Sequence, residues 1–383
     1  MKIAIVSHVR RDPAAGAATC TMSLANALRV SGQDVIEYYR GEYARAPLGK
    51  LEPDALAVTV LPLILQLRKT TDVLIMTGPL GWPASRLLKR MSVGNRMLRV
   101  AMTYGLEHHD HATVLEEAIA GHAHIGRMAK ARWKMLVRPA VESSVRRADV
   151  FVALRERDRE FVIKSGWKGR EQTFVMGLGV DDDVYEIAKH DASTWINRIA
   201  WCGTTGVRKG WQYFRDGFVR VASEMPNLRL DIIGSRRETA DIMNEFPPSL
   251  VNSIIVHPVL PRKEQFRIMA NADAFVSTSL SEGYHQAVQE AMALGVPIIA
   301  TAEGFIGDIE SAERPILEIP KRSSEAVAQA IQKLSQDAAL RKRLSILGCE
   351  WGESKRWATI GTATSLWFEE QVSFRNQAEL RKQ

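Results

Sequence analysis

The chain is poor in cysteine and has no long apolar run, and both absences limit what it can be. Only three of its 383 residues are cysteine, at the widely separated positions 20, 202 and 349. This number and spacing offer neither an even disulfide set nor a cluster of metal ligands. The longest apolar segments, such as Leu56 to Leu67, are too short and too interrupted to span a bilayer. We therefore expect a protein of a reducing cytoplasm.

Targeting and low-complexity segments are also missing. A single lysine and the short apolar run Ile3 to Val6 stand where a signal peptide would need a long apolar core and a cleavage site. No short-period repeat interrupts the chain. A length of 383 residues favours two domains, because single cores stop growing at about 250–300 residues.

Acidic charge is in the minority. The 51 Lys and Arg against 44 Asp and Glu give a net charge of +7, which favours an acidic partner such as nucleic acid, an anionic membrane or a phosphorylated substrate. Nucleic acid is disfavoured, because the basic residues lack a recognition motif. Between Arg86 and Arg147 the basic residues outnumber the acids most clearly.

Strand-like and helical segments alternate along both halves of the chain. This pattern predicts an α/β fold with two Rossmann-like, doubly wound domains facing across a cleft, over residues 1–178 and 179–353. Residues from about Ala112 to Ala148 are expected to form one long helical region. Ligands of such sheets bind at the carboxyl ends of the strands.

The most informative stretch runs from Ser281 to Ala300. An apolar strand ends in small polar residues and Glu282-Gly283, a helical pattern opens at about Tyr284, and Glu290 lies on that helix. Two carboxylates therefore stand eight positions apart, with the free N–H groups of a first helical turn between them. Such a turn binds anions.

A second loop carries cations. The segment Gly203-Thr204-Thr205-Gly206-Val207-Arg208-Lys209-Gly210 follows a strand and precedes a helix. Two positive charges beside a helix N-terminus are suited to a diphosphate.

Together the two segments resemble the Glu-x7-Glu motif and the Gly…Arg-Lys-Gly loop of family GT4, the retaining GT-B glycosyltransferases. The resemblance implies a GT-B fold with an N-terminal acceptor-side domain, a C-terminal donor-binding domain and a terminal helix, residues 354–383, that packs back on the first. It implies a nucleoside diphosphate sugar as co-substrate, with a UDP-sugar favoured over a GDP-sugar, no other cofactor and no metal.

The same resemblance assigns roles to single residues. Arg208, Lys209 and Glu282 are the expected catalytic residues, since fixed cations can meet the charge of the leaving diphosphate. The expected donor-binding residues come from both loops and from the first βα loop of the chain: Gly16, Gly203, Thr204, Gly283, Tyr284, His285, Gln286, Ala287, Val288 and Glu290.

Two positions depart from the family pattern. Thr204 stands where many members carry arginine, and Tyr104 stands where many carry a histidine that reaches the donor sugar. Either Tyr104 substitutes, or a later histidine reaches in, or the contact is missing, so Tyr104, His108 and His109 are candidate acceptor or sugar contacts. A metal cluster of His108, His109 and His111 is disfavoured, because no further ligands stand out. Asp181 to Asp183 are interpreted as structural.

The expected function is sugar transfer to a glycan or lipid-linked acceptor in surface polysaccharide or glycolipid biosynthesis. The alternatives are a soluble transferase acting on a small molecule and a non-catalytic GT-B protein that binds nucleotide sugars. The stretches Ala84 to Val100 and Ile125 to Arg138 mix apolar and basic residues. Either their apolar side chains face the core, or they form a peripheral contact with an anionic membrane at the inner face of the plasma membrane.

Overall fold

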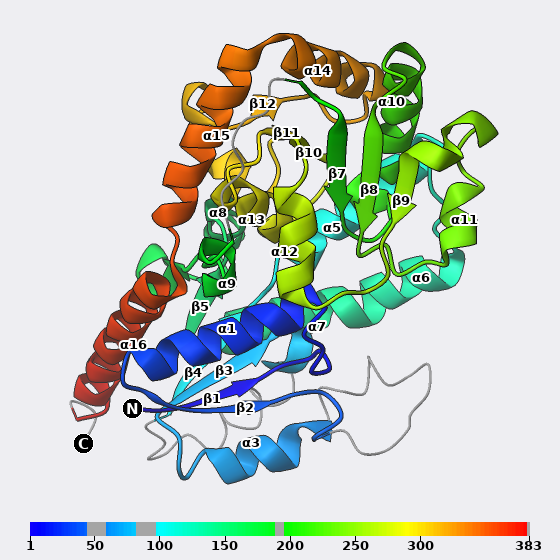
Figure 1. The fold of residues 1–383 in the computed structure, drawn as a ribbon. Coiled ribbons are helices and arrows are strands. Elements are labelled where there is room, and N and C mark those ends of the chain that lie inside the picture. The colour runs from blue at the N-terminus through cyan, green and yellow to red at the C-terminus, as the bar shows by residue number, and fades with distance from the viewer. Residues whose placement is uncertain (44–58, 82–96, 188–194, 381–383) are drawn as a thin grey trace. The chain divides into compact units, whose positions relative to one another are not determined.

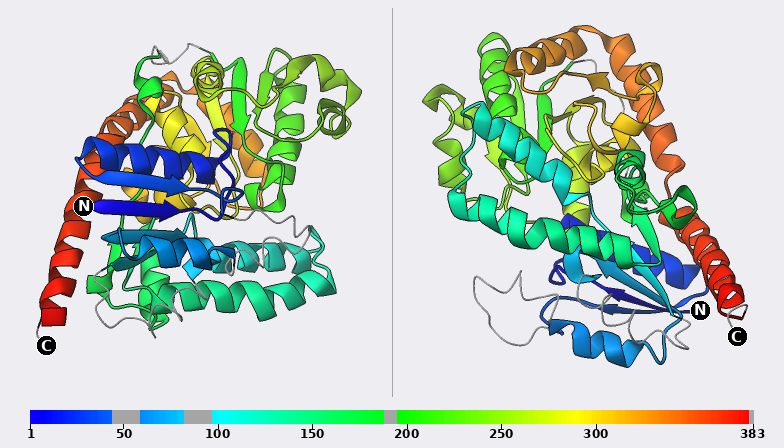
Figure 2. Two further views of the ribbon diagram at one scale, coloured as in Figure 1. Left: turned by 90° about the horizontal axis from the view of Figure 1, so that it is seen from below. Right: turned by 180° about the vertical axis from the view of Figure 1, so that it is seen from behind.

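The computed structural model describes residues 1–43, 59–81, 97–187 and 195–380 of the chain. They form two compact units. The first consists of Met1–His108, Ile125–Gly179 and Trp357–Gln383, and the second of His109–His124 and Val180–Arg356. Each unit contains a parallel sheet covered by helices, as the alternating sequence pattern predicted (Figures 1 and 2).

The sheet of the first unit has the order β2-β1-β3-β4-β5-β6. All residues of β3 and β4 are buried, because helices cover both faces, and this explains why their sequences are mostly apolar. The exception in β4 is Arg99, which pairs with Asp149 at 2.6 Å. The strands are β1 (Lys2–Val6), β2 (Asp34–Tyr38), β3 (Val73–Thr77), β4 (Leu98–Met102), β5 (Val150–Ala153) and β6 (Thr173–Val175). The helical segments are α1 (Gly16–Val30), α3 (Leu61–Leu67), η2 (Gly78–Leu80), α6 (Arg127–Arg132), η3 (Trp133–Val137), α7 (Arg138–Arg147), α8 (Glu156–Lys164), η4 (Arg170–Gln172) and α16 (Trp357–Leu380).

The sheet of the second unit has the order β12-β11-β10-β7-β8-β9. Its strands are β7 (Arg198–Cys202), β8 (Arg229–Ile233), β9 (Ile254–Val256), β10 (Ala274–Ser277), β11 (Ile298–Ala300) and β12 (Leu317–Glu318). Its helical segments are α9 (Asp182–Tyr185), η5 (Val207–Lys209), α10 (Trp211–Glu224), α11 (Thr239–Met243), η6 (Pro248–Ser253), α12 (Arg262–Ala270), α13 (Gln286–Ala293), η7 (Gly304–Asp308), η8 (Ser311–Glu313), α14 (Ser324–Gln336) and α15 (Ala338–Glu353).

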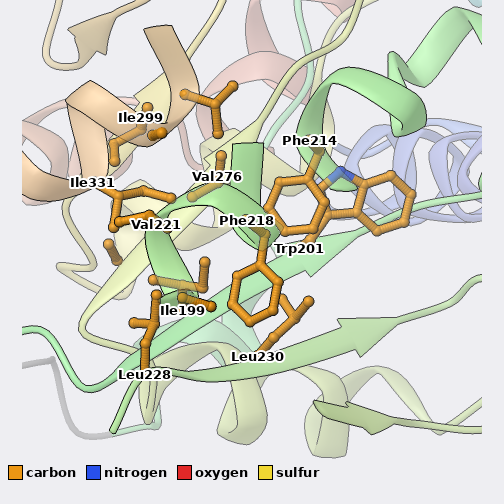
Figure 3. Packing of buried hydrophobic residues seen from close by; sticks show 14 of the residues in the cluster. Ile199, Trp201, Phe214, Phe218, Val221, Leu228, Leu230, Val276, Ile299 and Ile331 are labelled. Atoms are coloured by element: carbon orange, nitrogen blue, oxygen red, sulfur yellow. The ribbon is translucent and has the colours of Figure 1, made fainter. Parts of the chain in front are cut away.

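Aromatic side chains fill the core of the second unit. Trp201 of β7 stacks on Phe214 of α10, and Phe218 follows one turn later along the same helix (Figure 3). Aliphatic residues of β8, β10 and α14 complete the cluster. The rigid layer of β7, β10 and α10 supports the loops that leave these elements.

The order of the second sheet reverses between β7 and β10. The chain continues from β7 to β8 and β9 on one side, and from β10 to β11 and β12 on the other. Parallel pairing of Ala274 with Ile199 and Phe275 with Ala200 puts the carboxyl ends of β7 and β10 side by side. The reversal is a topological switch point, where loops separate and ligands bind in open α/β sheets.

The prediction of one helical region from about Ala112 to Ala148 was wrong. Helix α5 (Glu107–Ile119) begins earlier and ends before Gly121, which adopts a left-handed φ of 80°. Glycine takes this conformation without the steric penalty of a Cβ atom, so the helix stops there. Helical structure resumes at Arg127 and continues through α6, η3 and α7 to Arg147. Residues 109–124, with most of α5, belong to the second unit.

The last helix, α16, packs along α1 within the first unit (Figure 2). Gly361 makes this close approach feasible, because a Cβ atom at this position would lie 2.5 Å from the carbonyl oxygen of Ala27. Gln33, just after α1, donates from its side chain to Ser365 Oγ at 2.7 Å.

Replacing Gly361 by leucine should therefore destabilise the first unit. Overpacking of a close helix contact lowers the free energy of unfolding by about 1–3 kcal/mol. Urea unfolding followed by circular dichroism measures this change. Ala363→Leu, which adds the same volume on the exposed face of α16, should change the free energy of unfolding by about 0.5 kcal/mol or less. Equal effects of the two variants would contradict the packing described.

Candidate functional site

The loop between β10 and α13 is buried although it is polar. Ser279, Ser281, Glu282 and His285 each expose less than a tenth of their surface. Gly210 permits this burial on one side: it adopts φ 62°, and a Cβ atom there would clash with the carbonyl oxygen of Thr278. The loop is therefore packed against the neighbouring backbone, and its polar groups must find partners inside the protein.

Glu282 binds the cation predicted to act with it. Its Oε1 accepts hydrogen bonds from Lys209 Nζ at 2.5 Å and from Ser279 Oγ at 2.6 Å, and its Oε2 lies 3.7 Å from Arg208 Nη1. Burial alone would raise the pKa of Glu282. The ammonium of Lys209 and the guanidinium of Arg208 outweigh burial and hold the pKa of this carboxyl well below its usual range. Glu282 is thus a buried anion with fixed partners.

Backbone hydrogen bonds join the cation loop to the Glu282 loop. The N–H groups of Leu280 and Ser281 donate to the carbonyl oxygen of Arg208, at 2.8 and 3.3 Å, and Thr278 Oγ1 donates to that of Lys209 at 3.1 Å. Arg208 and Lys209 end the 3₁₀ turn η5, directly before α10, as predicted from the sequence. The two motifs, about 70 residues apart in the chain, form one site.

Gly203 and Thr204 lie at the start of the cation loop. Gly203 has φ 145°, and a Cβ atom there would contact the stem of Lys209 at 3.2 Å. The absence of a side chain therefore leaves room for Lys209. The carbonyl oxygen of Thr204 accepts from the N–H of Gly206 at 2.8 Å, and the Thr204 side chain is exposed.

His285 fixes the entry to α13. It adopts a left-handed φ of 85° as the N-cap residue of α13, an uncommon conformation for a residue with a side chain. Its ring is buried, with Nε2 2.7 Å from Ser277 Oγ and Nδ1 3.4 Å from the carbonyl oxygen of Glu303. Burial lowers its pKa from 6.5 to about 4, so the ring is neutral at pH 7.

The remaining predicted residues of this loop surround the start of α13. Gly283 precedes Tyr284, whose ring packs on Phe305 at 5.1 Å between centroids. Gln286 and Ala287 begin the helix, where N–H groups have no acceptor within the helix itself. The side chain of Val288 is buried in the core, and its N–H donates to the carbonyl oxygen of His285 at 3.1 Å, so Val288 supports the loop from behind.

Glu290 is held by an arginine that the sequence did not single out. Arg262, the first residue of α12, donates from Nη2 to Glu290 Oε1 and, at 2.9 Å, to Asp181 Oδ2. Burial raises the pKa of Glu290, and Arg262 opposes this rise. Asp181, interpreted as structural, is thus a partner of the same guanidinium.

Ser277, Ser279 and Arg262 were missed because their partners are distant or unremarkable in the sequence. Twenty-eight residues separate Arg262 from Glu290, and no local pattern joins them. The serines directly before Glu282 were a signal that could have been used, since small hydroxyl side chains there can satisfy a buried carboxylate.

In the first unit, Gly16 is the first residue of α1, after a loop whose turn is closed by the Ala14 N–H and Asp12 Oδ1 at 2.9 Å. Tyr104 directs its hydroxyl to Thr21 Oγ1 and Ser7 Oγ. Burial raises the pKa of Tyr104, which keeps the hydroxyl protonated.

His108 packs among the rings of Trp133, Phe161 and Trp167, with centroids 5.3–5.5 Å apart. His109 is half-buried on α5 and opens the second unit. Among the described residues no group of three or more His, Cys, Asp or Glu is placed to hold a metal ion. None of the helices in the described part of the chain combines the length and apolar character needed to cross a bilayer.

Known proteins resemble parts of this sequence and its fold. Residues 196–337 match the family model described as glycosyl transferases group 1. A GDP-mannose-dependent alpha-mannosyltransferase of Mycobacterium tuberculosis is 31% identical over 129 residues, 32% of each chain. The capsular polysaccharide biosynthesis glycosyltransferase CapM of Staphylococcus aureus is 25% identical over 220 residues, 53% of this chain and 57% of CapM. The matched regions thus span about a third and somewhat over half of these relatives.

Solved structures resemble the chain over almost its full length. Sucrose-phosphate synthase from Thermosynechococcus elongatus has a TM-score of 0.75 at 17% identity, covering 97% of this chain and 99% of the synthase. HepE of Anabaena, in complex with UDP and glucose, has a TM-score of 0.68 at 16% identity, covering 97% of this chain and 100% of HepE. The GT-B fold inferred from the motifs is confirmed, and the match to the group 1 glycosyl transferase model lies within the second unit.

The buried ring of His285 makes stability depend on pH. Its pKa of about 4 in the folded state lies below the ordinary 6.5, so as the pH falls the unfolded chain binds a proton that the folded chain does not. The contribution of the neutral His285 ring to stability is therefore complete above pH 6.5 and is lost progressively between pH 6.5 and 4. Between pH 7 and 5 the wild type should lose about 1–2 kcal/mol more free energy of unfolding than His285→Asn, which removes the titrating group.

Urea unfolding followed by tryptophan fluorescence at both pH values measures this difference. His8, whose pKa burial also lowers to about 4, titrates in both proteins and does not affect the comparison. His124→Asn, at an exposed position, should keep the wild-type pH slope. Equal slopes in the wild type and His285→Asn would contradict the assignment.

Proposed function

We propose that this GT-B protein is a retaining glycosyltransferase that moves a sugar from a nucleoside diphosphate sugar to a glycan or lipid-linked acceptor, without a metal ion. The observation that carries the proposal is the pair of cations, Arg208 and Lys209, fixed on buried Glu282 directly before helix α10. Such fixed charges can stabilise a leaving diphosphate, the part that a metal ion plays in other transferases.

In the proposed reaction the bond between the sugar C1 and the diphosphate oxygen breaks, and its electron pair goes to the diphosphate. The acceptor oxygen forms the new bond to C1 on the same face, and its proton goes to the leaving diphosphate. Arg208 and Lys209 stabilise the negative charge that develops. Loss of one such contact typically costs about 2.7–4 kcal/mol of transition-state stabilisation.

In this proposal Glu282 and Glu290 contact opposite ends of the nucleotide-sugar donor. Glu282 would accept hydrogen bonds from the sugar, and Glu290 from the ribose hydroxyls. A carboxylate accepts such bonds best when ionised, and Lys209 and Arg262 favour that state in the two residues. The N–H groups of the first turn of α13 would bind phosphate or sugar oxygens.

The donor base is proposed to be uracil, with guanine as the competitor. HepE supports the first as a structural neighbour bound to UDP, and the mycobacterial mannosyltransferase supports the second as a GDP-mannose-dependent relative. CapM, a capsular polysaccharide enzyme, supports an acceptor in surface glycan assembly.

Lys209→Met should abolish most donor binding and slow transfer by about 100- to 1000-fold, because the leaving diphosphate loses a fixed cation. Thermal unfolding with UDP, GDP and ADP in the presence of EDTA measures the binding. In the wild type, one nucleotide at 100 times its Kd should stabilise by about 2.7 kcal/mol.

Lys333→Met removes the same charge from the exposed face of α14 and is expected to leave the shift unchanged. Absence of a shift in the wild type with every nucleotide would contradict the proposed donor site. Donor binding without turnover of any UDP- or GDP-sugar would favour the non-catalytic alternative.

A membrane contact of the first unit is part of the proposal. From Arg127 to Val137 no side chain is buried, and Met128 and Met135 expose 83% and 72% of their surface. Met128 and Met135 therefore do not face the core, whereas Val137 of the same stretch packs against it. No acid occurs between Ile125 and Val141, whereas five basic residues do: Arg127, Lys130, Arg132, Lys134 and Arg138.

An exposed helical face that combines apolar and basic side chains binds anionic lipid surfaces. Such a contact would place the enzyme at the cytoplasmic face of a membrane, where lipid-linked acceptors are found. Of the second stretch predicted to bind a membrane, Ala84 to Val100, residues 84–96 lie outside the described residues, and Met97 and Leu98 are buried.

The triple variant Met128→Ser, Met135→Ser and Leu136→Ser should reduce binding to phosphatidylglycerol vesicles at least tenfold, since each fully buried apolar side chain contributes about 1.5–3 kcal/mol. Co-sedimentation measures the bound fraction, which should also fall as salt rises. Ile346→Ser with Leu347→Ser changes exposed apolar residues of α15 and should have no effect. Vesicle binding that does not depend on salt concentration or lipid charge, and that is equal in the wild type and the triple variant, would contradict the proposed contact.

A further inference from the structure

Helix α5 is fixed to the second unit by a buried carboxylate. Glu117 is 0% exposed and accepts hydrogen bonds from Arg322 Nε and, at 2.8 Å, from the hydroxyl of Tyr213. Removing such partners strongly destabilises the folded protein, because an uncompensated charge is left buried. The partners of Glu117 therefore determine where α5 lies within this unit.

Arg322 binds the same helix, α5, although its own backbone conformation is unfavourable. It adopts a left-handed φ of 62°, which is unfavourable for a residue with a Cβ atom. Its guanidinium contacts both Glu117 and, at 2.8 Å, Glu116 of α5. An unfavourable backbone conformation persists only where the surrounding contacts hold it in place. The ion pairs between Arg322 and α5 are among the contacts that do so.

The position of α5 places a further acid beside the donor-binding cations. Asp110 precedes Glu117 by seven residues, two helical turns, and lies on the same face of α5. Its Oδ1 accepts from Ser281 Oγ at 2.7 Å, and its Oδ2 lies 3.5 Å from Arg208 Nε. Asp110 thus contacts the residue before Glu282 and one of the two cations.

This acid is unexpected in a site for a diphosphate. Arg208 and Lys209 bring two positive charges, and Glu282 and Asp110 bring two negative charges, so these four side chains are neutral together. Removing Asp110 would leave a net positive charge and favour an anionic ligand. Asp110 must therefore weaken donor binding, and its contribution must lie elsewhere.

The contacts of Arg208 indicate that contribution. Asp110 holds its Nε, and the carbonyl oxygen of Ser281 accepts from its Nη1 at 3.3 Å. A guanidinium is a planar fork with a fixed set of donor directions. Two contacts on different nitrogens set the orientation of that plane, and orientation controls how well a fixed charge stabilises a transition state.

We propose that Asp110 is a positioning residue of the donor site: it orients Arg208 and the Ser281 loop for transfer, and it lowers the affinity for the diphosphate. This inference rests on the proposed function. It adds a residue from α5 to the β7 and β10 loops, and it predicts opposite effects on binding and on turnover.

Asp110→Asn tests both effects, because asparagine keeps the size and an oxygen acceptor for Ser281 but removes the charge. Isothermal titration with uridine, UMP and UDP should show little change for uridine and a three- to tenfold lower Kd for UDP, with UMP between them. The increase in affinity for UDP should become smaller as the salt concentration rises. UDP release from UDP-glucose should fall at least tenfold in kcat. The corresponding guanosine series and GDP-mannose replace these probes if the wild type selects guanine.

Glu325→Gln is the matched control, since it removes one negative charge from the exposed pair with Arg220, and both readouts should stay at the wild-type level. Weaker UDP binding or an unchanged kcat in Asp110→Asn would overturn the inference. Failure of the wild type to bind any nucleotide would instead contradict the proposed function, so the two failures are distinguishable.

A double-mutant cycle with Glu117→Gln tests the role of α5. If Glu117 acts by holding Asp110 in place, the loss in kcat of the double variant should equal that of Asp110→Asn alone. Additive losses would overturn the coupling between the two residues.

Discussion

The candidate site depends on one buried ion pair, between Lys209 and Glu282. A carboxylate in this position is stable only with several partners, and the protein supplies the Lys209 ammonium, the Ser279 hydroxyl and the nearby Arg208. These groups come from loops that follow β7 and β10. They meet because the two strands are neighbours at the point where the order of the sheet reverses.

Buried carboxylates held by cationic side chains recur elsewhere in the second unit. Arg262 joins Glu290 to Asp181, and Arg322 joins α5 to the rest of the unit through Glu117. In each case the charges are fixed by protein contacts. A site whose dipoles and charges are already oriented does not have to reorganise when a ligand or transition state appears, and this is the main electrostatic means of catalysis.

The two units differ in what they offer a partner. The second provides a buried polar loop with paired charges, suited to a small anionic ligand that must be oriented. The first provides an exposed basic and apolar helical face from Arg127 to Val137, suited to a broad anionic surface. The π-helical segment η3 lies within this face, and such segments are frequent at functional positions. The proposed donor chemistry and the proposed membrane contact therefore belong to separate structural units.

The sequence by itself determined the α/β class, the two sheets and the positions of Arg208, Lys209, Glu282 and Glu290, because strands, helix starts and loop motifs are local patterns. The break after α5 was not predicted, because a single glycine outweighed the surrounding helical pattern. The exposure of Met128 and Met135 was not predicted either, because the sequence of a helix with apolar and basic residues does not show whether its apolar side chains face the core or the solvent. The partners of the buried carboxylates were decided by the tertiary structure alone. Arg262, Asp110 and Arg322 contact residues 28 to 205 positions away. Only the packing of α12 on α13, and of α5 on the rest of the second unit, brings those charges together.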